Sequence, residues 1–244
     1  MANRFRRLLS KFILSTKNNL VSLEKPYQTI AHLLKEHPIT GIIDAGASNG
    51  SVSRRLLRFF PKADVYAFEP NPLYTERLLA YSREEKRFKP NFKALSDHEG
   101  MTKLYITHSP GSTSLFRALN IRNETYSQGM KLKNVEHVEV VTIDNWIASN
   151  GNLDIQVIKF DIQGGELSAL KGATNALSNS ILLVYTEIIF TPLYQGGALY
   201  SEIDLYLRES GFELYDIYGP KYTSKGQLAW ANAIFINSSK LFLE

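Results

Sequence analysis

A glycine-rich turn lies directly after a short apolar stretch, in the segment Asp44-Ala45-Gly46-Ala47-Ser48-Asn49-Gly50. Glycines let the backbone come close to a ligand, and a helix that begins after such a turn offers free N–H groups. At the end of the next apolar stretch, Phe68-Glu69-Pro70 places a carboxylate where an acidic side chain usually binds two ribose hydroxyls. Together the two segments predict a nucleoside-containing cofactor, bound across the ends of the strands.

The spacing of the glycines separates the classes of nucleoside cofactor. A dinucleotide fingerprint has the pattern G-x-G-x-x-G, whose second glycine lies against a pyrophosphate. This chain has D-x-G-x-x-x-G instead, with Asp44 just before the turn. Because a carboxylate there repels a pyrophosphate and suits a ligand with an ammonium group, we predict S-adenosylmethionine. An NAD-type oxidoreductase on a related fold is the alternative, and the missing third glycine argues against it.

Another carboxylate follows a later apolar stretch. Asp161 comes directly after Val157-Ile158-Lys159-Phe160, at a strand end that faces the cofactor crevice. When an alcohol is methylated, its hydroxyl must lose a proton as the oxygen attacks, and a nearby carboxylate can act as general base. We therefore predict that Asp161 is this base. The alternative is a structural carboxylate that orients the cofactor.

Two further residues are candidates for catalysis. His108 lies in a stretch that we expect on the acceptor side, and histidine accepts protons near neutral pH; an exposed loop histidine is the alternative. Glu166 lies in the expected first turn of a helix, where the helix dipole alone also favours an acidic residue. Asp161, Glu166 and Glu187 would suit Mg²⁺ as oxygen ligands, but their spacing does not require it, so we predict no metal.

Two segments are candidates for contacting the acceptor. Gln163 either donates a hydrogen bond to the substrate or closes the turn after Asp161. Residues 190–197 follow a strand end and carry an aromatic side chain and two glycines, which makes them a candidate pocket loop. Within that loop Tyr194 is either a packing residue or a ligand-binding one.

Apolar strands alternate with amphipathic helices from residue 40 onward, which is typical of a parallel sheet with crossover helices. Strands are expected at 41–44, 64–68, 91–95, 156–160 and 181–188, and helices at 51–60, 72–81, 166–177 and 200–210. Residues 100–150 interrupt the alternation with two β-like stretches around a Gly/Ser/Thr/Asn-rich middle, so they predict a β insertion with a mobile loop. Strands at 212–218 and 230–237 predict a final antiparallel hairpin.

Composition excludes several classes of protein. The chain has 244 residues and no cysteine, so it has no disulfide, thiolate metal site or cysteine nucleophile. No apolar run approaches the roughly 20 residues that cross a bilayer, and no small-residue cleavage site follows the first residues. We therefore expect a cytoplasmic protein. The net charge of +4 is concentrated in residues 1–25, so it does not indicate a nucleic-acid-binding body.

The first residues form a separate pattern. Apolar side chains recur on one helical stripe at Phe5, Leu8, Leu9, Phe12 and Ile13, opposite a basic face. Such a helix packs on the domain or on a dimer partner, docks on an anionic membrane surface, or binds nucleic acid. A second helix is expected at 26–36. We therefore divide the chain into a helical extension, 1–40, and a catalytic domain, 41–244, and leave the oligomeric state open.

The motifs resemble those of the FkbM family of S-adenosylmethionine-dependent methyltransferases. The shared segments are the glycine turn, Phe68-Glu69-Pro70, Ala94-Leu95-Ser96-Asp97, Ile158-Lys159-Phe160-Asp161-Ile162-Gln163-Gly164-Gly165-Glu166 and Leu170-Lys171-Gly172-Ala173. The resemblance covers residues 41–237. It implies an α/β, Rossmann-like seven-stranded sheet, mostly parallel, with helices on both faces, and O-methylation of a hydroxyl on a small molecule, natural product or saccharide. The alternative from another class is a non-catalytic nucleoside-binding or docking module.

The resemblance also assigns site residues. Asp44, Gly46 and Gly50 would line the methionine part of the cofactor, and Glu69 would hold the ribose. Ser96 or Asp97 would border the adenine, although Ser-Asp is also ordinary turn chemistry. The remaining expected cofactor contacts are Ser48, Asn49 and Asp161.

Overall fold

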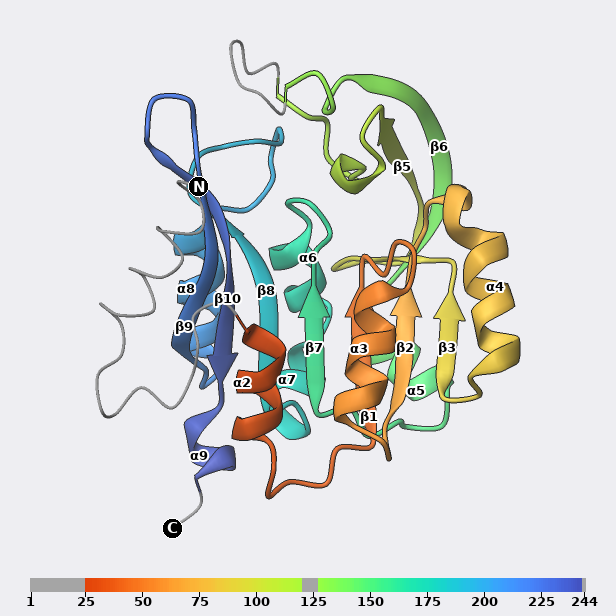
Figure 1. The fold of residues 1–244 in the computed structure, drawn as a ribbon, viewed down its shortest axis with the longest axis vertical. Helices are drawn as coiled ribbons and strands as arrows, with labels where there is room; N and C mark the ends of the chain where they lie inside the picture. Colours follow the sequence, from red (N-terminus) through yellow and green to blue (C-terminus); the bar gives the residue numbers. More distant parts are fainter. Residues whose placement is uncertain (1–24, 120–126, 243–244) are drawn as a thin grey trace, which may run out of the picture.

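A computed structural model describes residues 25–119 and 127–242, and the apolar stripe expected between Phe5 and Ile13 lies outside them. The main sheet has seven strands in the order β3-β2-β1-β7-β8-β10-β9 (Figure 1). The strands are β1 (Gly41–Ala45), β2 (Asp64–Phe68), β3 (Phe88–Asn91), β7 (Val157–Phe160), β8 (Leu183–Ile189), β9 (Glu213–Tyr222) and β10 (Leu228–Ile236). The first five are parallel, and β10 runs antiparallel between β8 and β9. This confirms the predicted fold class and the final hairpin.

Helices cover both faces of the main sheet. One face carries α2 (Pro26–Leu33), α3 (Ser51–Phe59), α4 (Thr75–Glu84) and α9 (Ser238–Leu241). The other carries α5 (Ile143–Ser149), α6 (Glu166–Lys171), α7 (Thr174–Asn179) and α8 (Tyr200–Glu209). In Figure 1, α2 and α3 lie in front of the sheet and α6 and α7 behind it. The buried residues of the central strands therefore pack into one of two cores, according to the alternation of their side chains.

The helix α2 belongs to the first of these cores. Its residue Ile30 and the following Leu34 are buried, and Tyr27 packs edge-on against Tyr185 of β8, with ring centroids 5.5 Å apart. Among the described helices, none combines the length and apolar character that crossing a membrane requires.

A smaller sheet corrects two expected boundaries. The strand expected at 91–95 is divided, because β3 ends at Asn91 and β4 (Ala94–Leu95) pairs instead with β6 (Leu132–Val141). β5 (Gly100–Thr107) pairs antiparallel with β6 and completes this sheet. The insertion expected at 100–150 is thus joined to residues of the divided strand, and β5 rises above the carboxyl ends of the parallel strands (Figure 1). Short one-turn helices occur at Pro72–Tyr74 and Pro110–Ser112.

Other helical regions also differ from expectation, and the segment expected as a helix at 72–81 is a one-turn helix followed by α4, which continues to Glu84. The end of the insertion folds as α5, whose N-cap Thr142 accepts a hydrogen bond from Asn145 N, a signal that the sequence contains. The helix expected at 166–177 is two helices, α6 and α7, because Gly172 lies against the chain at Ser96. A Cβ atom at Gly172 would lie 2.1 Å from Ser96 O, so this close approach requires glycine.

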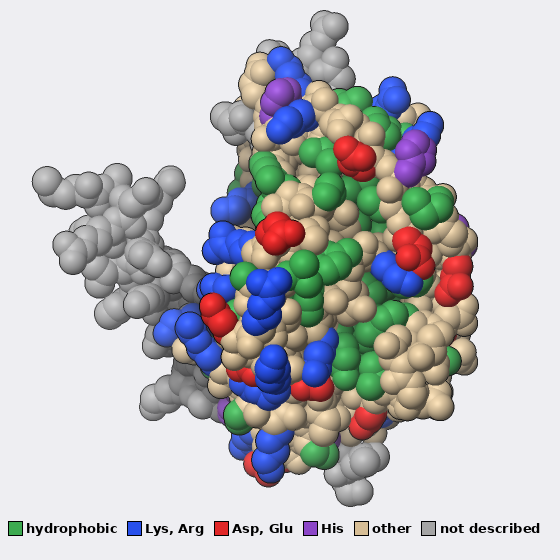
Figure 2. Space-filling model, turned by 90° about the vertical axis from the view of Figure 1, so that its right-hand side faces the viewer, with side chains coloured by type: hydrophobic (Ala, Val, Ile, Leu, Met, Phe, Trp, Pro, Cys, Tyr) green, Lys and Arg blue, Asp and Glu red, His purple; other side chains and the backbone are tan. Residues whose placement is uncertain are grey.

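One edge of the main sheet is formed by β3. This strand contains Pro90, which has no N–H to donate to a neighbouring strand and is therefore suited to an edge. Figure 2 faces this side of the molecule, where Lys and Arg side chains are more frequent toward the left and apolar side chains lie across the middle. Leu73, Phe92 and Met101 are among the exposed apolar residues of the chain.

Candidate active site

The carboxyl ends of three strands bring the predicted residues together. The register of the sheet aligns Ala45 with both Phe68 and Phe160, the last residues of β2 and β7. Gly46, Glu69 and Asp161, which follow these three residues, therefore lie side by side at one edge of the sheet. All three line a pocket. This is where open α/β sheets bind their ligands.

The glycine turn is tightly packed against the neighbouring loop. Gly46 has a left-handed backbone with φ of 74°, and a Cβ atom there would lie 1.9 Å from Asp161 O. Ser48 also has a positive φ, 50°, and its N–H donates to Glu69 Oε2 at 2.7 Å. The turn is thus bound to both neighbouring strand ends, which holds the pocket wall in one shape.

Glu69 forms the polar wall of the pocket. Its side chain is only 7% exposed, and Oε1 accepts a second backbone hydrogen bond, from Asn71 N at 2.9 Å. Burial raises the pKa of Glu69, while these hydrogen bonds and the charge of Lys159 oppose that shift. Each carboxylate oxygen retains capacity for a further hydrogen bond. A carboxylate fixed in this way can accept bonds from two neighbouring hydroxyl groups of a ligand.

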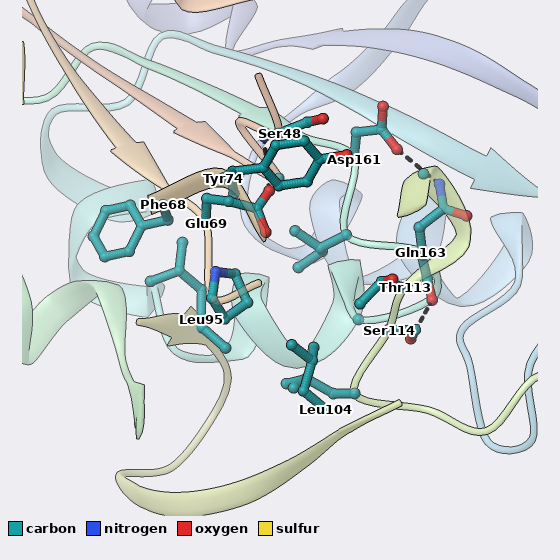
Figure 3. A pocket seen from close by; sticks show the side chains of 18 of the residues that line it. Ser48, Phe68, Glu69, Tyr74, Leu95, Leu104, Thr113, Ser114, Asp161 and Gln163 are labelled. Atoms are coloured by element: carbon teal, nitrogen blue, oxygen red, sulfur yellow. Dashed lines mark hydrogen bonds between the residues drawn. The ribbon is translucent and has the colours of Figure 1, made fainter. Parts of the chain in front are cut away.

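The other walls next to Glu69 are apolar. Phe68 and Leu95 lie at one end of the pocket in Figure 3, Leu104 below them and Tyr74 beside Glu69. Leu104 comes from β5, and Leu115 comes from the segment that follows it. The β insertion, which we expected on the acceptor side, therefore closes the apolar part of the pocket. Apolar walls beside a hydroxyl-binding carboxylate suit a nucleoside, whose base is flat and whose sugar is polar.

The opposite end of the pocket is polar. Asp161 is exposed and Gln163 half-buried, and a hydrogen bond of 2.8 Å joins Gln163 Nε2 to Asp161 Oδ1 (Figure 3). The same Nε2 donates to Glu187 Oε2 at 2.9 Å. Burial raises the pKa of Glu187 well above its usual value, and the charges of Asp161 and Glu166 raise it further. Two carboxylates therefore share one amide at this end of the pocket.

Glu166 lies behind this end. It is fully buried, and its Oε1 accepts a hydrogen bond from Ile162 N at 3.0 Å while Oε2 has no partner. Burial raises its pKa to about 7.

Over residues 25–119 and 127–242, no group of three histidine, aspartate or glutamate side chains is arranged to hold a metal ion.

Several predicted cofactor residues do not line the pocket. Asp44 is buried behind the turn, where its carboxylate faces Lys159 Nζ at 3.0 Å and accepts from Ser53 Oγ at 2.6 Å. Asn49 uses its Oδ1 to accept from Ser51 N at the start of α3, and Gly50 is the N-cap of that helix. These residues shape the turn, and their contact with a cofactor stays a prediction.

Three more predicted residues also lie outside the pocket lining. Ser96 is buried and bonds to Asp97 Oδ1, and Asp97 is paired with His98 at 2.8 Å, a hydrogen bond that lowers the pKa of Asp97. Their neighbours Ala94 and Leu95 line the pocket instead. The side chain of His108 is exposed, and the backbone N–H of this residue donates to Lys131 O. The structure therefore does not bring these three side chains together with Asp161.

Sequence reasoning gave no role to some residues that build the site. Lys159 is one of them, and a lysine inside an apolar strand is a signal of a buried, paired charge. Tyr74, Leu104 and Ser114 are the others. Nothing in the sequence marks Ser114, because its contact with Gln163 O at 2.7 Å joins segments that are 49 residues apart.

Comparisons with known proteins identify the family of the chain. Residues 44–214 match the family model of the methyltransferase FkbM domain. The chain is 28% identical over 195 residues to 2-O-methyltransferase NoeI of Sinorhizobium fredii, an alignment that covers 77% of this chain and 78% of that protein. It is 25% identical over 197 residues to methyltransferase sdnD of Sordaria araneosa, covering 71% and 73% respectively.

A solved structure supports the same fold. The crystal structure of methyltransferase FkbM from Methylobacillus flagellatus KT superimposes with a TM-score of 0.53 at 16% sequence identity. The match covers 91% of this chain but only 46% of that one, so this chain spans less than half of its length. The family model, by contrast, includes the glycine turn, Glu69 and Asp161 within a match that covers more than half of the chain. The chain therefore belongs to the FkbM family of methyltransferases.

Proposed function

We propose that this protein transfers a methyl group from S-adenosylmethionine to a hydroxyl group of a small molecule or saccharide. The observation that carries the proposal is the pocket itself. A buried, doubly hydrogen-bonded Glu69 stands beside apolar walls at one end, and Asp161 lies at the other. The two ends match a nucleoside and a polar acceptor respectively.

The residues present fit the cofactor. Glu69 would hold the ribose hydroxyls, Phe68, Leu95 and Leu104 would enclose the adenine, and Gly46 and Ser48 would face the methionine portion. Gly46 lines the pocket, and its lack of a side chain lets the turn pack directly against the backbone at Asp161. When bound, S-adenosylmethionine supplies a methyl group on a positively charged sulfur.

At the polar end of the pocket, where the acceptor would bind, Asp161 would act as the general base. An exposed carboxylate oxygen at this position can accept the proton of an alcohol as its oxygen becomes nucleophilic. Positioning the acceptor against the cofactor contributes more of the rate than the base does, because it replaces an encounter between two molecules. Hydroxyl methylation is further supported by the likeness to NoeI, which is a 2-O-methyltransferase.

Isothermal titration tests the cofactor class. We expect wild-type protein to bind S-adenosylhomocysteine and not NAD⁺. The Glu69→Ala variant should bind at least about a hundredfold more weakly, because two hydrogen bonds to a charged group are lost. The matched control is Glu84→Ala, which removes an exposed glutamate from α4 and should bind as wild type does. Preference for NAD⁺ would replace this proposal with the oxidoreductase alternative.

A transfer assay tests the reaction. S-adenosylmethionine with a labelled methyl group is incubated with a panel of simple glycosides and small alcohols, and alkali-stable label is counted on each. For any acceptor found, Asp161→Asn should reduce turnover by about 10²–10⁴-fold, the usual contribution of a general base. Its affinity for S-adenosylhomocysteine should be nearly unchanged. Equal loss of turnover and affinity would make Asp161 a cofactor-holding residue.

A further inference from the structure

Gln163 adopts an unusual backbone conformation at the polar end of the pocket. Its φ is 58°, in the left-handed region that residues other than glycine rarely adopt. The carbonyl oxygen of Gln163 accepts a hydrogen bond from Ser114 Oγ at 2.7 Å, which holds the backbone in place (Figure 3). The segment around Ser114, distant in sequence, thus maintains this strained conformation. Strained backbone of this kind is common at functional sites, where side chains must be held in one orientation.

The side-chain amide of Gln163 is fully used. Its Nε2 donates to Asp161 Oδ1 at 2.8 Å and to Glu187 Oε2 at 2.9 Å. Its Oε1 accepts a hydrogen bond of 2.5 Å from the hydroxyl group of Tyr194. An amide has two donor hydrogens, and here each serves a different carboxylate.

Tyr194 supplies the donor for the oxygen of this amide. Because the amino group of Gln163 faces Asp161 and Glu187, its oxygen points away from them and accepts from Tyr194. The residue Tyr194 is only 3% exposed, and burial raises its pKa, so its hydroxyl group stays protonated and able to donate. Its other contact, 3.4 Å to Ser112 O, is longer, and a hydroxyl has only one proton to give.

We propose that Tyr194 is a positioning residue for methyl transfer, which acts through Gln163 to hold Asp161 in place at the polar end of the pocket, beside the buried Glu187. The inference rests on the proposed function. Without the tyrosine hydroxyl, the amide oxygen of Gln163 loses its donor, and the side chain is held by its contacts with the two carboxylates alone. The amide is then free to shift, so Asp161 is held less firmly near the place where the cofactor's positive sulfur would lie.

The test requires no methyl acceptor. Sinefungin has a carbon atom in place of the sulfur of S-adenosylhomocysteine, and that carbon bears a positively charged amine. The ratio of the two affinities therefore reports the negative charge at this end of the pocket. Both dissociation constants are measured by titration near neutral pH. We expect Tyr194→Phe to lower the preference for sinefungin by about fivefold, the effect of one hydrogen bond, and to leave S-adenosylhomocysteine affinity unchanged.

The matched control is Tyr218→Phe. Its hydroxyl is also buried and bonds to Thr29 Oγ1 at 3.1 Å, outside the residues that line the pocket. This variant should keep the wild-type ratio. In a Gln163→Met background, which lacks the amide, Tyr194→Phe should produce no further change, since Tyr194 acts only through Gln163.

An unchanged ratio in Tyr194→Phe, or an effect that persists fully in the Gln163→Met background, would overturn the inference. Loss of S-adenosylhomocysteine affinity in Tyr194→Phe would also overturn it, because the residue would then hold the pocket rather than the carboxylates. If wild-type protein bound neither compound, the proposed function itself would fail.

Discussion

Asp44 Oδ1 and Lys159 Nζ lie 3.0 Å apart, and both side chains are buried between neighbouring strands. Burial opposes the charge on Lys159, but the carboxylates of Asp44 and Asp161 outweigh it, so its pKa is raised and it stays charged. Its ammonium group also donates to the carbonyl oxygens of Ala45 and Gly46 at 3.2 and 3.1 Å. Lys159 thereby secures the start of the glycine turn.

Removing this lysine should destabilise the protein. Lys159→Met leaves the Asp44 carboxylate buried without its counter-charge, which typically costs about 3–5 kcal/mol of unfolding free energy. Urea denaturation measures the loss. Lys35→Met, which removes an exposed lysine paired with Glu36, should cost less than about 1 kcal/mol. A similar small loss in both variants would show that the buried pair contributes little to stability.

Glu166 should give the protein a pH-dependent stability. Burial raises its pKa from 4.5 to about 7, so between these values the folded state holds a proton that the unfolded state has lost. Wild-type stability should therefore fall as the pH rises through this interval and level off above it. Glu166→Gln removes the contribution of Glu166 and so makes the slope shallower, by at most about 3 kcal/mol over the interval. The raised pKa of Glu187 leaves a remaining slope of the same sign.

Unfolding curves recorded across this pH interval test the prediction. The exposed Glu209→Gln variant serves as control and should follow the wild type at every pH. Parallel pH profiles for wild type and Glu166→Gln would contradict the prediction, since Glu166 would then titrate alike in both states.

Gly46 should not tolerate a side chain. In Gly46→Ala the added Cβ would lie 1.9 Å from Asp161 O, and the backbone φ of 74° adds strain. We expect a loss of about 3 kcal/mol or more in unfolding free energy, together with loss of S-adenosylhomocysteine binding. Gly111→Ala is the control within the same pocket, because a Cβ there meets nothing within 4 Å. If both variants bound equally well, the close approach at Gly46 would be irrelevant to the site.

Ser114 should control the rate at which the pocket opens. Its hydroxyl donates to Gln163 O and accepts from Phe116 N at 2.9 Å, so it ties the wall formed by the insertion to the loop after β7. Ser114→Ala leaves both backbone groups without this partner, and S-adenosylhomocysteine should dissociate about tenfold faster. Stopped-flow displacement measures this rate. Ser178→Ala, which removes a hydroxyl from exposed helix surface, should leave it unchanged.

The sequence itself determined the architecture and the position of the central site residues. Alternation of apolar strands with amphipathic helices predicts a parallel sheet because each element must bury one face or stripe. In such a sheet, residues that follow a strand gather at one edge, and Gly46, Glu69 and Asp161 all follow apolar stretches. That they lie at the same edge of the sheet therefore follows from local pattern, whereas the contact between Gly46 and Asp161 also requires β7 to lie beside β1.

Tertiary structure decided what these residues contact. The contact of Asp44 with the ammonium group of a ligand stays a prediction, and the sheet adds a neighbour that local pattern did not indicate, Lys159, in register on β7. Local pattern does not specify that β7 is the neighbour of β1, since strand order depends on long-range packing. Likewise, the closure of the pocket by Leu104 and the bond between Ser114 and Gln163 depend on how a long insertion folds back over the sheet. Such contacts join segments whose separation in sequence carries no periodic signal, so only the folded chain determines them.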